Sequence, residues 1–104
     1  MKTLKSYAEC EDFIQSERVV TLLFMDESCP DCALLKPTLP ALSEALASQI
    51  AWVERKDVPF MVKHYEVYGV PSILIFKAQK EIARWVDRTP KRSDELLHFI
   101  TRYL

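Results

Sequence analysis

Two segments of the chain are apolar at nearly every position, and they constrain the fold more than any other feature. Residues 19–25 read Val-Val-Thr-Leu-Leu-Phe-Met, and residues 73–76 read Ile-Leu-Ile-Phe. A strand with one face in water alternates apolar and polar residues, whereas a strand buried on both faces reads as a continuous apolar run. We therefore predict two central strands in a sheet that is covered on both faces.

Helical patterns around these strands supply the covering layers. Residues 7–15 place apolar side chains at helical spacing, with Ser6 as a plausible N-cap. A second helical pattern follows residue 30 and reaches residue 47. Because proline removes a backbone donor, we predict a kink at Pro37 and place Pro40 in the first turn of the next helical segment.

The remaining segments alternate in the same way. We predict a short edge strand near the N-terminus, a strand over residues 50–53, and a helix over residues 60–68 that Gly69 ends in a left-handed conformation. Residues 81–86 form the hairpin partner of residues 73–76, and an amphipathic helix with Asp94 and Arg102 on its polar side finishes the chain. This order predicts an α/β fold with a central mixed β-sheet of about four to five strands, flanked by helices on both faces.

Length and charge limit the classes of protein that need to be considered. A chain of 104 residues is long enough for one compact domain, residues 1–104, and its formal net charge of −1 suggests neither nucleic acid nor acidic lipid as a partner. The first residues lack the apolar stretch of an export signal, and no apolar run approaches the roughly 18 residues of a membrane span. We expect a cytoplasmic protein with no membrane or nucleic-acid partner.

The motif Ser28-Cys29-Pro30-Asp31-Cys32 lies where the first apolar strand gives way to a helix. A Cys-x-x-Cys pair in this context, in a compartment where structural disulfides are rare, is typical of a redox site. If Cys29 caps the helix, the free N–H groups and the helix dipole stabilise its thiolate, which makes it the candidate nucleophile. Cys32, three residues on, is the candidate resolving thiol, which would close a reversible Cys29–Cys32 disulfide.

The cysteine pair has an alternative interpretation as part of a zinc site. A closed zinc site needs four ligands, and the chain adds only Cys10, His64 and His98, without a recognisable second pair. We therefore predict no metal. Cys10 belongs to the apolar stripe of residues 7–15, where a lone cysteine is most often a small buried hydrophobe.

The sequence resembles the thioredoxin family over most of its length. The matching features are the apolar strand, Cys29 and Cys32, Pro37 beyond the pair, the segment Tyr68-Gly69-Val70-Pro71-Ser72, and the apolar strand that follows it. The resemblance implies a thioredoxin fold, a cis bond before Pro71, and a substrate peptide bound beside Val70, Pro71, Ser28 and Pro30. It also implies a monomeric protein-disulfide reductase that takes part in cell redox homeostasis and electron transport. Its substrates would be protein disulfides, and it would need no bound cofactor. A thioredoxin reductase or another thiol donor would supply the electrons.

Several positions depart from the family's usual residues. Ser28 and Met25 stand where tryptophans are common, Leu23 replaces a buried acid that helps to deprotonate the resolving cysteine, and Asp87 replaces a glycine of the docking groove. The proton route is therefore missing or is supplied by another group, such as Asp26 or Asp31, which we expect to tune the thiol pKa values.

We expect Asp31 to disfavour a thiolate on Cys29 at the helix start, because the two negative charges repel each other.

Together, these departures from the family's usual residues predict a selective rather than a general reductase. Two other functions stay open at this point: a glutathione-dependent, glutaredoxin-like reductase, and a redox-inert binding module with the same fold.

Overall fold

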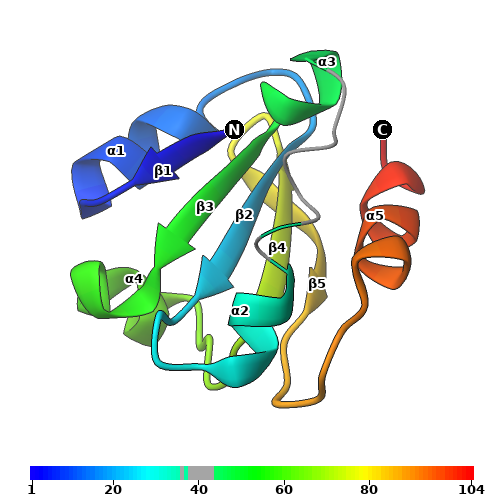
Figure 1. Ribbon diagram of the computed structural model, residues 1–104. Coiled ribbons are helices and arrows are strands. Elements are labelled where there is room, and N and C mark those ends of the chain that lie inside the picture. The colour runs from blue at the N-terminus through cyan, green and yellow to red at the C-terminus, as the bar shows by residue number, and fades with distance from the viewer. Residues whose placement is uncertain (36, 38–43) are drawn as a thin grey trace.

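The fold is described from a computed structural model, in which residues 1–35, 37 and 44–104 are placed. Strands alternate with helices, as the sequence predicts (Figure 1). The strands are β1 (Lys2–Leu4), β2 (Val20–Met25), β3 (Ile50–Glu54), β4 (Ser72–Lys77) and β5 (Lys80–Trp85). The helices are α1 (Tyr7–Ile14), α2 (Pro30–Leu35), α3 (Glu44–Ala47), α4 (Pro59–His64) and α5 (Ser93–Thr101), with a 3-10 turn, η2 (Arg55–Asp57), after β3.

The strands form one mixed sheet of five strands in the order β1-β3-β2-β4-β5. β3 pairs in parallel with both β1 and β2, whereas β4 runs antiparallel to both β2 and β5. The predicted apolar strands β2 and β4 are neighbours, with Leu22 opposite Leu74 and Leu23 opposite Ile73. These strands occupy the middle of the sheet, which explains why every residue of β2 is buried.

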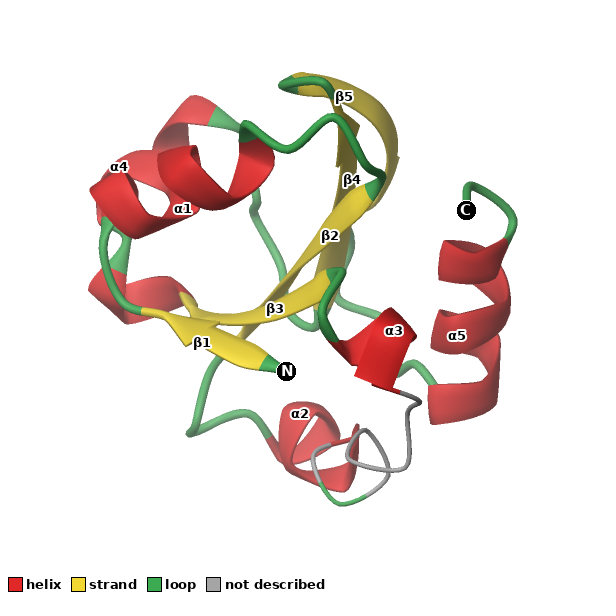
Figure 2. Cartoon of the chain, turned by 90° about the horizontal axis from the view of Figure 1, so that it is seen from above, coloured by secondary structure: helices red, strands yellow, loops and turns green. Residues whose placement is uncertain are grey.

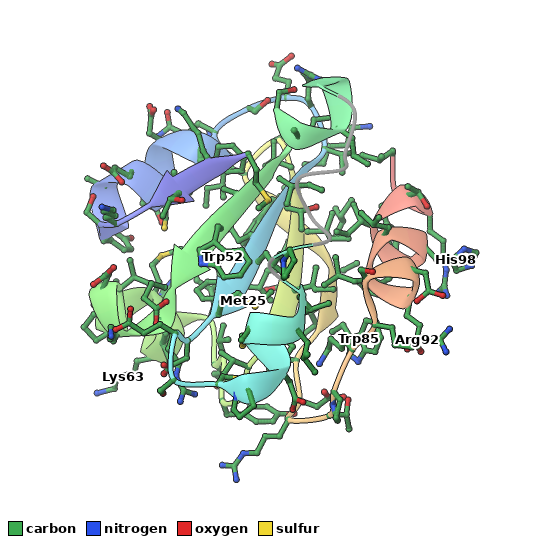
Figure 3. The ribbon with its side chains drawn as sticks, in the orientation of Figure 1. Met25, Trp52, Lys63, Trp85, Arg92 and His98 are labelled. Atoms are coloured by element: carbon green, nitrogen blue, oxygen red, sulfur yellow. The ribbon has the colours of Figure 1, made fainter. Side chains whose placement is uncertain are left out.

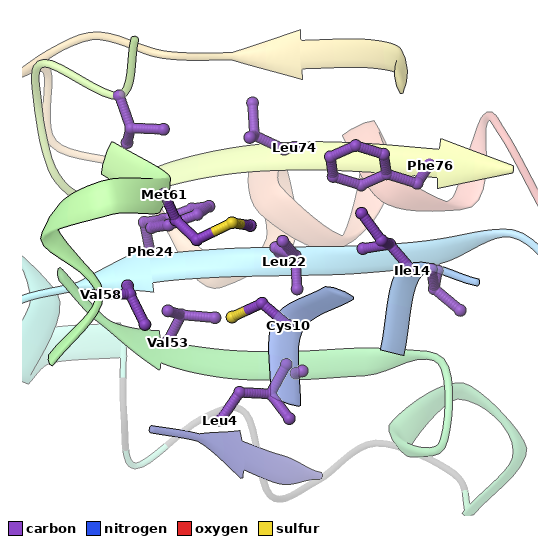
Figure 4. Close-up of a cluster of buried hydrophobic side chains, with 13 residues drawn as sticks. Leu4, Cys10, Ile14, Leu22, Phe24, Val53, Val58, Met61, Leu74 and Phe76 are labelled. Carbon is purple, nitrogen blue, oxygen red and sulfur yellow. The ribbon is translucent and has the colours of Figure 1, made fainter. Parts of the chain in front are cut away.

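Helices cover both faces of the sheet, which confirms the predicted fold class. α1 and α4 lie on one face, and α2 and α5 lie on the other (Figures 1 and 2). Alternate residues of the central strands therefore enter two different cores. Leu22, Phe24 and Leu74 meet α1 and α4 (Figure 4), whereas Leu23 and Ile73 meet α2 and α5.

The end of α4 differs from the prediction that Gly69 would be the left-handed cap. Glu66 has the positive φ, 54°, and Gly69 does not. The N–H of Val67 donates to the carbonyl of Val62 at 2.9 Å, and the N–H of Glu66 donates to the carbonyl of Lys63 at 3.3 Å. These bonds form a Schellman motif, which turns the chain so that Val67 is buried in the core.

The predicted helical pattern over residues 30–47 contains α2 and α3, with Pro37 exposed in a turn after α2. The expected kink at Pro37 and the expected position of Pro40 involve residues 36 and 38–43, which lie outside the described residues. The predicted hairpin is present, because β4 and β5 are joined through Ala78 and Gln79, which both have positive φ. This backbone conformation matches the twist of the flanking strands.

Candidate active site

The cysteine pair belongs to the start of α2, which lies at the end of the sheet where β2 and β3 finish (Figure 1). Pro30 begins α2, so Cys29 stands immediately before the helix. The backbone N–H of Cys32 donates to the Cys29 sulfur at 3.2 Å, and the Cys29 carbonyl accepts from the N–H of Ala33 at 3.1 Å. The Cys29 side chain therefore caps the helix, and a negative charge on its sulfur would face a backbone donor.

The two thiols differ in their surroundings. Cys29 is half-buried, whereas Cys32 is 2% exposed and packs in the core beneath α2. Burial, together with a side-chain hydrogen bond to Cys29, raises the pKa of Cys32 to about 12. Cys32 therefore keeps its proton at neutral pH. Both cysteines are free thiols in this structure.

Cys10 belongs to the core on the opposite face of the sheet, between α1 and the central strands (Figure 4). It is fully buried, and burial raises the pKa of its thiol to about 11. This placement confirms the expectation that Cys10 is a small buried hydrophobe.

A turn from a distant part of the chain reaches the cysteine pair. The Val70–Pro71 peptide bond is cis, and the Cys29 sulfur lies 4.0 Å from the Val70 carbonyl oxygen. The Ser72 hydroxyl donates to the Gly69 carbonyl at 2.5 Å and holds this turn at the start of β4. The structure thus brings Cys29, Cys32, Val70 and the adjoining Pro71 together at one end of the sheet.

Asp26 organises the loop between β2 and α2. One carboxylate oxygen accepts from the N–H and the hydroxyl of Ser28 at 2.9 and 2.7 Å, and the other accepts from Arg55 Nε at 2.8 Å. The Ser28 hydroxyl and N–H, followed by Arg55, lower the pKa of Asp26 to about 2. Asp26 is therefore a charged and weakly basic group near neutral pH, which makes it a poor acceptor for the Cys32 proton.

The sequence interpretation missed Arg55, which lies far from Asp26 along the chain. No local pattern could have paired the two residues, because they meet only where β2 and β3 end side by side. The neighbouring loop is fixed in a similar way, since the Glu27 N–H donates to a Glu54 carboxylate oxygen at 3.0 Å and Lys56 pairs with Glu27.

Asp31 and the two exposed residues of the motif lie on the outer side of the pair. Ser28 and Pro30 are exposed, and Asp31 is half-buried. Asp31 and Leu34 line a hollow of about 290 Å³ together with residues 90–93. The hollow lies between α2 and the segment that leads into α5.

The described residues contain no cluster of three or more His, Cys, Asp or Glu side chains that could hold a metal ion. His64 and His98, the histidines that the zinc interpretation considered, lie on α4 and α5 and are exposed.

Comparison with known proteins decides the family. The thioredoxin family model matches residues 2–102. The chain belongs to the thioredoxin family. It is 31% identical to a thioredoxin of Chlamydia trachomatis over 86 residues, which cover 82% of each protein. It is 28% identical over 71 residues to thioredoxin X, a chloroplastic protein of Arabidopsis thaliana, covering 66% of this chain and 39% of that protein.

Solved structures agree on the fold. The Fasciola hepatica thioredoxin superimposes with a TM-score of 0.85 at 23% identity, and a Plasmodium falciparum thioredoxin superimposes with a TM-score of 0.86 at 18% identity. Both comparisons cover all of each chain. Family membership and the dithiol geometry together make this thioredoxin-family chain a thiol-disulfide oxidoreductase that acts on protein disulfides.

The departures from the usual thioredoxin residues have clear structural consequences. Leu23 is fully buried in the same core as Cys32, and Trp52 lies opposite it on β3. Met25 and Trp52 lie on the part of the sheet behind α2 (Figure 3). Apolar packing thus occupies the position of the usual buried acid, and the carboxylate whose charge acts on the Cys32 thiol is that of Asp26, in the loop between β2 and α2.

Proposed function

We propose that this thioredoxin-family protein reduces protein disulfides with Cys29 as the nucleophile and Cys32 as the resolving thiol. The single observation that carries the proposal is the contrast between the two sulfurs. Cys29 is partly exposed and accepts a backbone hydrogen bond at 3.2 Å, whereas Cys32 is buried and its pKa is raised to about 12. A partly exposed sulfur that accepts a backbone hydrogen bond attacks first, and a buried thiol next to it reacts second.

The reduction of one substrate disulfide needs only the groups of the chain and that disulfide. The Cys29 thiolate attacks one substrate sulfur, a mixed disulfide forms, and the other substrate sulfur leaves as a thiolate. Cys32 then attacks the Cys29 sulfur and gives its proton to the departing substrate sulfur, which forms the Cys29–Cys32 disulfide and releases the second substrate thiol. Two electrons pass to the substrate, and an external thiol donor such as a thioredoxin reductase must restore the dithiol. The chemistry requires no bound cofactor.

The surroundings of the pair support a binding groove for an extended peptide. We assign peptide contacts to Val70 and Pro71, whose turn approaches the Cys29 sulfur, and to the exposed Ser28 and Pro30 on either side of it. Peptide groups of Val70 can pair with a substrate backbone, as at a sheet edge.

Asp26 and Asp31 are the proposed tuning groups. Asp26 acts as a fixed negative charge that orients the loop through Ser28, and Asp31 places a second carboxylate at the start of α2. Both charges oppose a further negative charge on the thiols.

No helix among the described residues is long and apolar enough to cross a membrane. We infer a monomer that works in the cytoplasm.

Turbidimetric reduction of insulin tests this proposal. We expect wild type and Cys10→Ser to accelerate reduction by dithiothreitol well above the rate of the reagent alone, and Cys29→Ser to give no acceleration. A Cys32→Ser variant should accumulate a mixed disulfide on Cys29, which mass spectrometry of trapped complexes can locate.

Other outcomes would contradict the proposal in identifiable ways. Activity that requires glutathione would favour a glutaredoxin-like reaction, and inactivity with both donors would favour a binding module. A trapped partner bonded to Cys32 or Cys10 would show that Cys29 is not the nucleophile.

A further inference from the structure

The loop after β5, residues 86–92, runs along the same end of the sheet as the dithiol (Figure 1). It lies against Gly69 so closely that a Cβ atom on Gly69 would be 2.3 Å from the Asp87 carbonyl oxygen and 2.9 Å from Cγ of Arg88. Gly69 directly precedes Val70, whose carbonyl oxygen is 4.0 Å from the Cys29 sulfur. The side chain of Arg88 therefore starts next to the turn that flanks the attacking thiol.

Internal hydrogen bonds hold this loop in place. One carboxylate oxygen of Asp87 accepts from Lys91 Nζ at 2.8 Å and from the N–H and hydroxyl of Thr89 at 3.0 and 2.7 Å. The other accepts from Trp85 Nε1 at 3.2 Å. The loop backbone next to Arg88 is thus fixed from both sides, and Arg88 extends from an ordered position.

One of these contacts also offsets the charge of Asp87. The Lys91 side chain is fully buried, with Nζ 4.9 Å from the centre of the Trp85 ring. Although desolvation opposes it, hydrogen bonds from Lys91 and Thr89 lower the pKa of Asp87 to about 2, so the pair is charged on both sides and internally balanced. The negative charge that the sequence places in the docking groove is therefore offset by Lys91.

Arg88 differs from the other basic residues of its own loop and from those of η2. Arg55 pairs with Asp26, Lys56 with Glu27, Lys91 with Asp87, and Arg92 with Asp94. Arg88 is exposed and forms no ion pair with any described residue. An unpaired guanidinium presents several N–H donors in a plane that matches a carboxylate, so its preferred partner is an acidic side chain.

We propose that Arg88 is a specificity determinant that selects disulfides in which an acidic residue neighbours the cysteine attacked by Cys29. The proposal rests on the proposed function, because it takes Cys29 as the nucleophile and Val70 as the place where the substrate peptide lies. A peptide extended along Val70 brings the side chains that flank its cysteine to Gly69, where Arg88 is. The substrate class is therefore an acidic peptide segment around an accessible disulfide.

Short peptides that differ in one side chain test the proposal. Each is an acetylated tripeptide amide with a central cysteine joined to 2-thiopyridine, a neutral leaving group, and with Glu, Gln or Lys on one side of the cysteine. The Cys29 thiolate attacks the peptide sulfur and expels pyridine-2-thiolate, whose absorbance is followed. Cys32 then attacks the Cys29 sulfur and releases the peptide thiol, so that one dithiol is oxidised and one disulfide is reduced.

We expect wild type to prefer the Glu peptide over the Gln peptide by about 2- to 5-fold at low salt, which is the range of an exposed ion pair. The preference should approach unity in Arg88→Met and at roughly 1 M salt, where charges are screened. Arg88→Lys should retain most of it, and Arg88→Glu should prefer the Lys peptide. A merely structural role of Arg88 would not invert the preference.

Arg92→Met is the matched control. It removes an exposed guanidinium from the end of the same loop, but this guanidinium is already paired with Asp94. Its preference for the Glu peptide should equal that of wild type. Equal rates with Glu and Gln peptides in wild type, an unchanged preference in Arg88→Met, or an equal loss in Arg92→Met would each overturn the proposal.

The proposed function fails differently in the same assay. If wild type releases no pyridine-2-thiolate from any peptide, or if release persists in Cys29→Ser, the assignment of Cys29 is wrong. Release that depends on Cys29 but ignores the flanking residue contradicts the role of Arg88 alone.

Discussion

The Asp26 carboxylate should stabilise the fold near neutral pH and lose this effect in acid. Ser28 and Arg55 lower its pKa to about 2 in the folded protein, whereas an aspartate in an unfolded chain titrates near 3.9. The difference corresponds to roughly 2.5 kcal/mol of folding free energy. Because the Arg55 side chain is 40% exposed, solvent screens part of the ion pair, so we expect about 1–2 kcal/mol.

The sign of the pH dependence follows from the lowered pKa. Between the two pKa values the unfolded chain binds a proton that the folded protein does not bind, so stability falls as the pH falls. The stabilisation is complete above about pH 5 and disappears as the pH drops through the folded pKa near 2. An Asp26→Asn variant lacks this titration while it keeps the size of the side chain.

Urea unfolding of the reduced protein, followed by tryptophan fluorescence at a series of pH values, measures the effect. Asp26→Asn should be less stable than wild type by about 1–2 kcal/mol near pH 7, and the two curves should converge toward about pH 2. Glu27→Gln, which removes the exposed pair with Lys56, should change little at any pH. A stability difference that is constant with pH, or no difference at neutral pH, would refute the role given to the Asp26 charge.

Three further predictions concern single positions. Asp31→Asn should raise the reduction potential of the active-site disulfide by up to about 20 mV, because the substitution removes a charge that opposes the thiolate. Equilibration with glutathione measures this potential, and a lower potential than that of wild type would contradict the prediction. Gly69→Ala should lower the free energy of unfolding by about 1–3 kcal/mol, since the added Cβ meets the Asp87 carbonyl oxygen at 2.3 Å, and unchanged stability to urea would count against it. Cys10, buried and with its pKa raised to about 11, should resist iodoacetamide at neutral pH while Cys29 is modified; early labelling of Cys10, detected by mass spectrometry, would show that its helix opens.

The fold was predictable from the sequence because its main determinants are local. A continuous apolar run such as β2 can be satisfied only by cover on both faces, and the helical patterns on either side supply that cover. The start of α2 was predictable for the same reason, since Cys29 and Pro30 define the cap and first residue of a helix within two positions.

Gly69 has a different role from the predicted helix cap. Helix ends favour glycine when nothing else competes, but here burial of Val67 places the left-handed residue at Glu66. Gly69 instead leaves room for the backbone of Asp87. That close approach joins two segments far apart in the chain, so no local pattern could predict it.

The dithiol shows most clearly what the sequence decides and what the tertiary structure decides. The sequence alone determined that Cys29 would cap a helix with Cys32 behind it, because a spacing of three residues and the proline between them act within one helical turn. Only the tertiary structure decided what surrounds the pair. Arg55 pairs with Asp26, the Val70 carbonyl approaches the Cys29 sulfur, and Arg88 lies beside Gly69. These three residues come from separate segments, and the order and direction of β2, β3, β4 and β5 bring the loops that carry them to one end of the sheet.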